Sequence, residues 1–113
     1  LDIATAAESE LARILEGQDA LVYALGLDDR KPLPKPAYKA LRDDHVDLCL
    51  RVLRAAKAAG ARKAVVLGSY FTSLARLRPE LGLSDAHPYV RTRGEQSRAV
   101  LAESARGFDT FML

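Results

Sequence analysis

Tyr89 and Arg93 are the residues of this sequence whose types and spacing best suit proton transfer. They lie four positions apart in a helical pattern, so they share one face of that helix. A tyrosine, with a pKa of about 10, needs help to act as a base near neutral pH, and a neighbouring cation favours the phenolate. Arginine supplies this positive charge, and its guanidinium group can also donate hydrogen bonds to hydroxyl groups. It does not give up a proton. The alternative is a tyrosine at the core boundary beside a solvated arginine.

Small and hydroxyl-bearing residues follow two short apolar segments that are typical of buried strands. Ala24 and Gly26 come at the end of the first segment, and Gly68 and Ser69 follow the second. Ligands gather at the carboxyl ends of parallel strands, so Ser69 could bond a substrate oxygen there. The small residues would let a cofactor approach the backbone closely. Equally, Gly26 can be a turn glycine, and Ser69 can be a turn serine bonded to its own backbone.

Other residues that could do chemistry also have structural interpretations. His45 is either a packed helix residue or a site residue, and His87 precedes a proline as a loop or cap residue would. Cys49, the single cysteine, falls on an apolar stripe and packs as a small hydrophobe. Metal-ligand spacing is absent, so we predict no metal site. Four arginines could meet a phosphate-bearing substrate or form a solvated surface, namely Arg76, Arg78, Arg91 and Arg93.

An alternation of helices and strands must position these residues. The capping-box pattern of Thr5 and Glu8 predicts a first helix, which Gly17 ends. Two further helices, three strands and a proline-rich loop follow: strands at 19–25, 63–67 and 108–113, the loop at 26–37, and helices at 38–59 and 88–106. Residues between the second strand and the last helix read as irregular. Helical crossovers of this kind predict an α/β fold with three parallel strands.

Composition limits the classes of function. The 113 residues are 49% hydrophobic and 28% charged, as in a globular protein, and the formal charge of +2 is too small to indicate a nucleic-acid binder. No apolar run approaches the roughly 20 residues of a membrane-spanning helix. One cysteine fits a reducing, cytoplasmic setting. The first residue is Leu1, so we expect a piece of a longer chain.

Four segments follow one another in an order and at separations that are also found in one protein family: Asp19–Gly26, His45–Asp47 with Leu53–Gly60, Ala61–Ser69 and His87–Gln96. Together they resemble the fourth strand, the next helix, the fifth strand with its serine turn, and the tyrosine helix of extended short-chain dehydrogenases/reductases. This is the NAD-dependent epimerase/dehydratase family. The resemblance identifies residues 1–113 as the second half of a Rossmann-like doubly wound parallel sheet. The glycine-rich half that precedes it in the family is not in this sequence.

The sequence departs from the family at three places around the expected site. Arg93 stands where the family has lysine, and His45 stands where it usually has asparagine. In an ungapped reading, the usual catalytic serine or threonine falls on Tyr70, with Ser69 beside it.

The resemblance implies an NAD(P)-dependent oxidoreductase or epimerase acting on a small carbonyl, hydroxyl or nucleotide-sugar substrate. Tyr89, Arg93 and Ser69 would be catalytic, and the NAD or NADP would lie against Ala24, Gly26, Gly68, Tyr89 and Arg93. The competing hypothesis is a dinucleotide-binding sensor or interaction module without catalysis. We expect a homodimer through the helices at 38–59 and 88–106, and no nucleic-acid or membrane partner.

Overall fold

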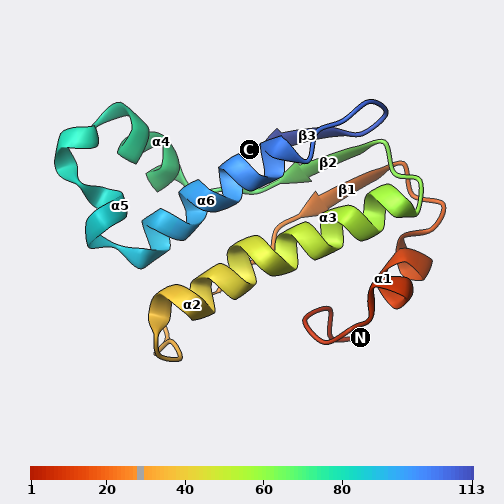
Figure 1. Cartoon of the computed structure of the whole chain (residues 1–113), viewed down its shortest axis with the longest axis horizontal. Coiled ribbons are helices and arrows are strands. Elements are labelled where there is room, and N and C mark those ends of the chain that lie inside the picture. Colours follow the sequence, from red (N-terminus) through yellow and green to blue (C-terminus); the bar gives the residue numbers. More distant parts are fainter. Residues whose placement is uncertain (28–29) are drawn as a thin grey trace.

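The computed structural model describes residues 1–27 and 30–113 and has an α/β fold built on a three-stranded, all-parallel sheet (Figure 1). The strands are β1 (Ala20–Tyr23), β2 (Lys63–Val66) and β3 (Asp109–Met112), and they lie in the order β1-β2-β3. Each neighbouring pair is joined through helices, which a parallel pair requires. The predicted alternation of helices and strands is therefore confirmed.

Helices precede β1 and fill both crossovers. α1 (Glu8–Leu15) comes before β1. Between β1 and β2, one continuous helix is made of α2 (Ala37–Arg42), the π-helical segment η1 (Asp43–Leu48) and α3 (Cys49–Ala58). Between β2 and β3 lie α4 (Tyr70–Leu77), the 3-10 helix η2 (Pro79–Leu81), α5 (Leu83–Ala86) and α6 (Pro88–Ala102).

α3 and α6 lie side by side over one face of the sheet (Figure 1). The main apolar core fills the space between them and the strands, and includes Leu53, Val66, Val100 and Phe108. Val46 is also buried within the chain. The predicted helices therefore bury much of their apolar surface against the sheet of their own chain.

The opposite face of the sheet is apolar and exposed. Val22, Val65 and Phe111 are paired in register across the three strands, so their side chains share this face. Val22 is 68% and Phe111 51% exposed. The non-alternating strands predicted burial on both faces, but helices of the described residues cover only one.

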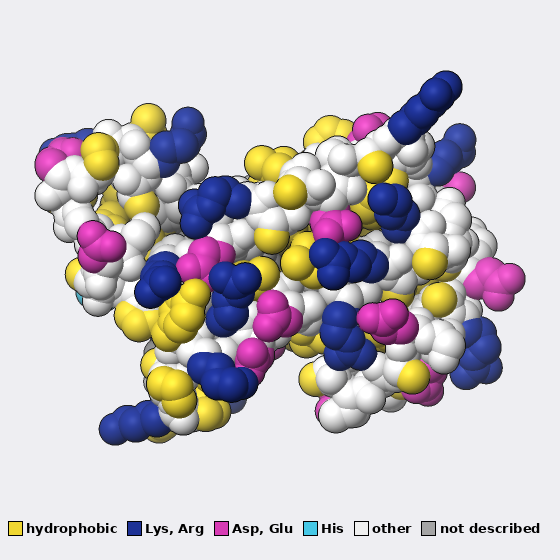
Figure 2. Space-filling model, in the orientation of Figure 1, with side chains coloured by type: hydrophobic (Ala, Val, Ile, Leu, Met, Phe, Trp, Pro, Cys, Tyr) yellow, Lys and Arg dark blue, Asp and Glu magenta, His cyan; other side chains and the backbone are white. Residues whose placement is uncertain are grey.

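The outward face of the helical layer is charged rather than apolar. Figure 2 shows acidic and basic side chains interspersed over it. One of its ion pairs joins α3 to the residue after α6, since Arg54 Nη2 lies 2.7 Å from Glu103 Oε1. None of the helices in the described part of the chain is long and apolar enough to cross a membrane.

Three local expectations differ from the structure. Thr5 does not cap α1, because the helix begins at Glu8 after Ala7, and the Thr5 hydroxyl donates to the Asp2 carbonyl instead. The stretch after β2 that read as irregular is mostly helical, as α4, η2 and α5. The last helix ends at Ala102 rather than near 106, because the chain then forms a tight bridge between Ala105 and Phe108.

Candidate functional site

Tyr89 and Arg93 are in direct contact on α6. Arg93 Nε donates a hydrogen bond to Tyr89 Oη over 3.2 Å, and the guanidinium carbon lies 5.3 Å from the centre of the tyrosine ring. Arg93 is only 8% exposed. The interpretation of Arg93 as a solvated surface charge is therefore wrong, since its charge lies within the protein beside the tyrosine.

Gly26 is the third predicted residue at this place. It follows β1, where a methyl group on its α-carbon would lie 2.5 Å from Arg93 Nη2 and 3.6 Å from His45 Nε2. The first distance is too short for a side chain while Arg93 stays in place, so a larger residue here would have to displace the end of the buried arginine. The structure thus brings Gly26, Tyr89 and Arg93 together.

His45 is fully buried in η1 and packs edge-on against Tyr89, with ring centres 5.4 Å apart. Its Nδ1 lies 3.0 Å from Thr92 Oγ1, and that hydroxyl donates its own hydrogen to the Tyr89 carbonyl. The Thr92 oxygen must therefore accept a hydrogen bond from Nδ1–H of His45. In the neutral ring the other nitrogen, Nε2, then carries no proton. Nε2 has no hydrogen-bond partner among the described residues and lies 3.9 Å from an oxygen of Asp44.

Burial governs the ionisation of the groups around His45. It lowers the pKa of His45 to about 4, and the positive charge of Arg93 acts in the same direction. Burial also raises the pKa of Asp44, against the opposing effects of a hydrogen bond from the Leu27 backbone and the charge of Arg93. The imidazole is thus a neutral group near pH 7.

Sequence reasoning missed the other members of this group. Gln96 Oε1 accepts a 2.9 Å hydrogen bond from Arg93 Nη1. The Tyr23 hydroxyl and Gln96 Nε2 are buried and have no partner among the described residues. Burial raises the pKa of Tyr23 and raises that of Cys49 to about 11, so Cys49 is a packed thiol as predicted. We call the whole set the buried polar cluster: Tyr23, Asp44, His45, Tyr89, Thr92, Arg93 and Gln96.

The sequence held a partial signal for this cluster. Gln96 lies three positions after Arg93, so the two share a helix face. Tyr23 ends a strand whose carboxyl end was already expected to face the site. Asp44 gave no signal of its own, because its position depends on how η1 packs against α6.

Ser69 and Gly68 lie elsewhere. Ser69 caps α4, where its Oγ accepts a 3.2 Å hydrogen bond from the Phe71 backbone. The Gly68 backbone donates to the Leu113 carbonyl over 2.9 Å. Both residues line a cleft of about 200 Å³ whose walls include neither Tyr89 nor Arg93. Tyr70, also in that cleft, is 75% exposed.

Ala24 is also separate from the buried polar cluster. It is exposed and lines an apolar groove of about 260 Å³ between β1 and α1. The six predicted site residues therefore divide among three places, with Gly26, Tyr89 and Arg93 at the first.

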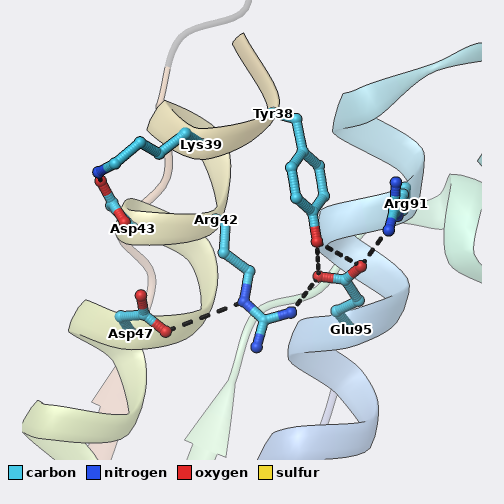
Figure 3. A network of polar contacts seen from close by, with 7 residues as sticks. All are labelled: Tyr38, Lys39, Arg42, Asp43, Asp47, Arg91 and Glu95. Atoms are coloured by element: carbon cyan, nitrogen blue, oxygen red, sulfur yellow. Dashed lines mark hydrogen bonds and ion pairs between the residues drawn. The ribbon is translucent and has the colours of Figure 1, made fainter. Parts of the chain in front are cut away.

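A second polar network fixes α2 against α6 beside this cluster (Figure 3). Tyr38 Oη donates to both oxygens of Glu95, at 2.9 and 3.0 Å, and Arg42 and Arg91 also donate to this carboxylate. The Arg91 guanidinium lies 4.3 Å from the centre of the Tyr38 ring. Burial acts to raise the pKa of Glu95, but the donors from Tyr38, Arg42 and Arg91 lower it overall. The network is a structural clamp on the helix that carries Tyr89 and Arg93.

No family model matches the chain, and no curated protein matches it. Within residues 1–27 and 30–113, no group of three or more His, Cys, Asp or Glu side chains could hold a metal ion. The resemblance to short-chain enzymes therefore rests on the sequence segments themselves and on the parallel α/β fold.

Proposed function

We propose that this chain belongs to an NAD(P)-dependent oxidoreductase or epimerase-like protein of the extended short-chain class, with Tyr89 as its proton-exchanging residue. The observation that carries the proposal is the hydrogen bond from buried Arg93 to Tyr89 Oη. A cation that donates to a phenolic oxygen stabilises negative charge on it, and a tyrosine gains that charge when it acts as a base. The substrate would be a small carbonyl, hydroxyl or nucleotide-sugar compound.

The residues present fit one end of a nicotinamide dinucleotide. Gly26 follows the carboxyl end of β1 and is exposed, and Arg93 Nη2 occupies the space that a side chain would take there. The dinucleotide, when bound, supplies hydride transfer. The seven glycines of the sequence form no glycine-rich phosphate motif, so the chain offers a place for the nicotinamide and its ribose rather than for the pyrophosphate.

A specific observation favours the second candidate, a dinucleotide-binding protein without catalysis. The Ser69 hydroxyl caps α4 instead of facing Tyr89, and exposed Tyr70 stands where short-chain enzymes have their serine or threonine. The Ser69 hydroxyl, which would align a substrate oxygen, thus lies away from Tyr89. Such a protein would keep the Arg93 contact for binding alone.

Ligand-observed NMR on the 113-residue chain tests the nicotinamide site. We expect nicotinamide riboside, which carries the ring and ribose without phosphate, to receive saturation from the protein at millimolar concentration. Arg93→Gln should abolish this transfer. The matched control is Arg91→Gln, since Arg91 lies on the same helix but bonds Glu95 outside the buried polar cluster. No transfer to the wild-type chain, or transfer unchanged by Arg93→Gln, would refute the nicotinamide site.

Turnover by the full-length protein separates the two candidates. Tyr89→Phe should lower kcat by about 100-fold or more, the usual loss for a missing general acid or base, while cofactor affinity stays nearly constant. Arg93→Lys should keep or raise activity, because it restores the family's residue. Full activity of Tyr89→Phe would show that the tyrosine is structural. Cofactor binding without measurable turnover would favour the sensor.

The expected homodimer through the helices at 38–59 and 88–106 is part of the same proposal. Its support is the resemblance, because extended short-chain enzymes commonly pair these two helices about a two-fold axis, whereas the charged face of Figure 2 is equally suited to contact with water. Leu50 adds a half-buried apolar residue on the first helix. Sedimentation velocity at high micromolar concentration should detect the dimer, and a monomer there would contradict it.

A further inference from the structure

A cleft of about 700 Å³ is lined by residues of α4, α5 and α6, and the proposed function does not use it. Neither Tyr89 nor Arg93 lines it. This volume lies within the usual range of small-molecule sites. Its walls combine guanidinium and hydroxyl groups with an apolar lining, which suits a ligand that carries both a charged group and a carbon skeleton.

The two arginines of this cleft have no charge partner. Arg76 comes from α4 and Arg98 from α6, and neither makes a hydrogen bond or ion pair with any residue that the structure describes. Among those residues, no Asp or Glu lines the cleft. The neighbouring arginines differ, since Arg78 bonds Glu80 and Arg91 bonds Glu95. The positive charges of Arg76 and Arg98 are therefore uncompensated among the residues that the structure describes.

Hydroxyl groups surround these charges. Four of them line the cleft, from Thr72, Ser73, Ser84 and Ser97. Thr72 Oγ1 is buried yet has no hydrogen-bond partner within the described part of the chain. A buried polar atom without a partner costs roughly 1–3 kcal/mol, so a ligand that satisfied it would gain affinity.

Small and apolar residues leave room beneath the polar groups. Gly94 faces the cleft, and the Arg98 guanidinium lies near it, since Nη1 would be 3.5 Å from a methyl group placed on Gly94. Ala75, Val90 and Leu101 supply the apolar part of the lining. A carbon skeleton can therefore lie on this floor while its polar groups meet the arginines and hydroxyls.

We propose that this cleft binds a phosphorylated polyol or sugar, with the phosphate held by Arg76 and Arg98. Guanidinium groups match phosphate oxygens with paired hydrogen bonds, which suits two arginines facing one cavity. Thr72, Ser73, Ser84 and Ser97 hold the ligand's hydroxyl groups. The site is independent of Tyr89 and of any dinucleotide.

Titration of the 113-residue chain with glucose 6-phosphate at low salt tests this site, by calorimetry and by backbone amide NMR. Amide shifts should cluster at residues 72–76, 84 and 94–98. Arg76→Gln and Arg98→Gln should each weaken binding about 10-fold or more, as the loss of a charged hydrogen bond does. The matched control is Arg78→Gln at the end of α4, which should stay within about twofold because Arg78 is paired with Glu80. Thr72→Val, nearly equal in shape, should weaken binding while the fold is kept.

Other outcomes would overturn the proposal. They are no binding of glucose 6-phosphate at about 10 mM, equal weakening by Arg78→Gln, or equal affinity for inorganic phosphate alone. Unphosphorylated glucose should not bind measurably, and binding equal to that of its phosphate would remove the role of the arginines. Circular dichroism of each variant separates lost binding from lost folding. Nicotinamide riboside carries no phosphate and reports on Arg93, so failure of one site is distinguishable from failure of the other.

Discussion

His45 should make the folded chain less stable as the pH falls from neutral toward 4. The ring is fully buried, its Nδ1–H is used by Thr92, and its Nε2 has no partner among the described residues. Arg93 lies beside it, so a second positive charge there is opposed both by burial and by the guanidinium. The folded protein therefore keeps the imidazole neutral at a pH where the unfolded chain protonates it.

The sign and size of this effect follow from the two pKa values. Near pH 7 the ring is neutral in both states, so His45 adds no pH dependence. Below its ordinary pKa of 6.5, the unfolded chain takes up a proton that the folded chain refuses until the pH approaches 4. Linkage then gives a loss of unfolding free energy of about 2 kcal/mol at pH 5 and about 3 kcal/mol below pH 4.

Asp44 acts in the opposite direction at the acidic end. Its pKa is raised in the folded state, so it takes up a proton before the unfolded chain does and adds stability as the pH falls. The His45 contribution must therefore be read from a difference between two proteins rather than from one profile. Tyr89 and Thr92 are the other polar residues in contact with His45.

Urea unfolding from about pH 7 to pH 4.5 supplies that difference. His45→Asn carries the residue usual in the resembling family and can still donate near the Nδ1 position. We expect this variant to lose less stability at low pH than the wild type, by about 2 kcal/mol at pH 5. His87→Asn is the matched control, because His87 is exposed and should leave the profile unchanged. Equal losses in wild type and His45→Asn would refute the burial argument.

Two further pairs of variants test the site by urea unfolding. Gly26→Ala should destabilise the chain by about 1–3 kcal/mol because its methyl group meets Arg93 Nη2, whereas Gly94→Ala should stabilise it by about 0.5–1 kcal/mol in the helix interior. Equal effects would mean that Arg93 does not depend on Gly26. Tyr38→Phe should cost about 1 kcal/mol through its lost bonds to Glu95, while Tyr23→Phe should be neutral or stabilising because it removes an unpartnered hydroxyl. A larger loss from Tyr23→Phe would indicate a partner that the structure does not contain.

The strands were predictable because local pattern decides them. Residues 19–25 and 63–67 are short, apolar and bounded by glycine or polar residues, and the structure has β1 and β2 inside these ranges. The helices after β2 were missed because Pro79 and Gly82 interrupt any long periodicity. Gly82, with a φ of +58°, joins η2 to α5 in a conformation that only glycine adopts freely. The sequence also allowed Ser69 to be a turn serine bonded to its own backbone. The structure agrees with this alternative, because Ser69 caps α4.

The site was predictable only as far as it lies on one helix. Tyr89 and Arg93 are four residues apart, so their contact follows from helical geometry. The contact of Gly26 with Arg93 joins residues 67 positions apart and depends on how β1 and α6 pack. The position of Ser69 after a strand and the resemblance both predicted a site role for it, but α4 uses the serine hydroxyl for its own first turn.

The π-helical segment η1 sets the rotational phase between the two ends of the long helix. His45, Val46, Leu48 and Cys49 are all buried around it, a wider spread than one α-helical stripe covers. Six residues in π geometry turn about as far as five residues in α geometry, so removal of one residue from 43–48 would let the helix continue as an α-helix with α2 still in phase with α3. Tyr38 and Arg42 would then still face Glu95. The same removal within α3 would turn the preceding part of the helix by about 100°, so a change of length by one residue is absorbed at the π-helical segment but not elsewhere in the helix.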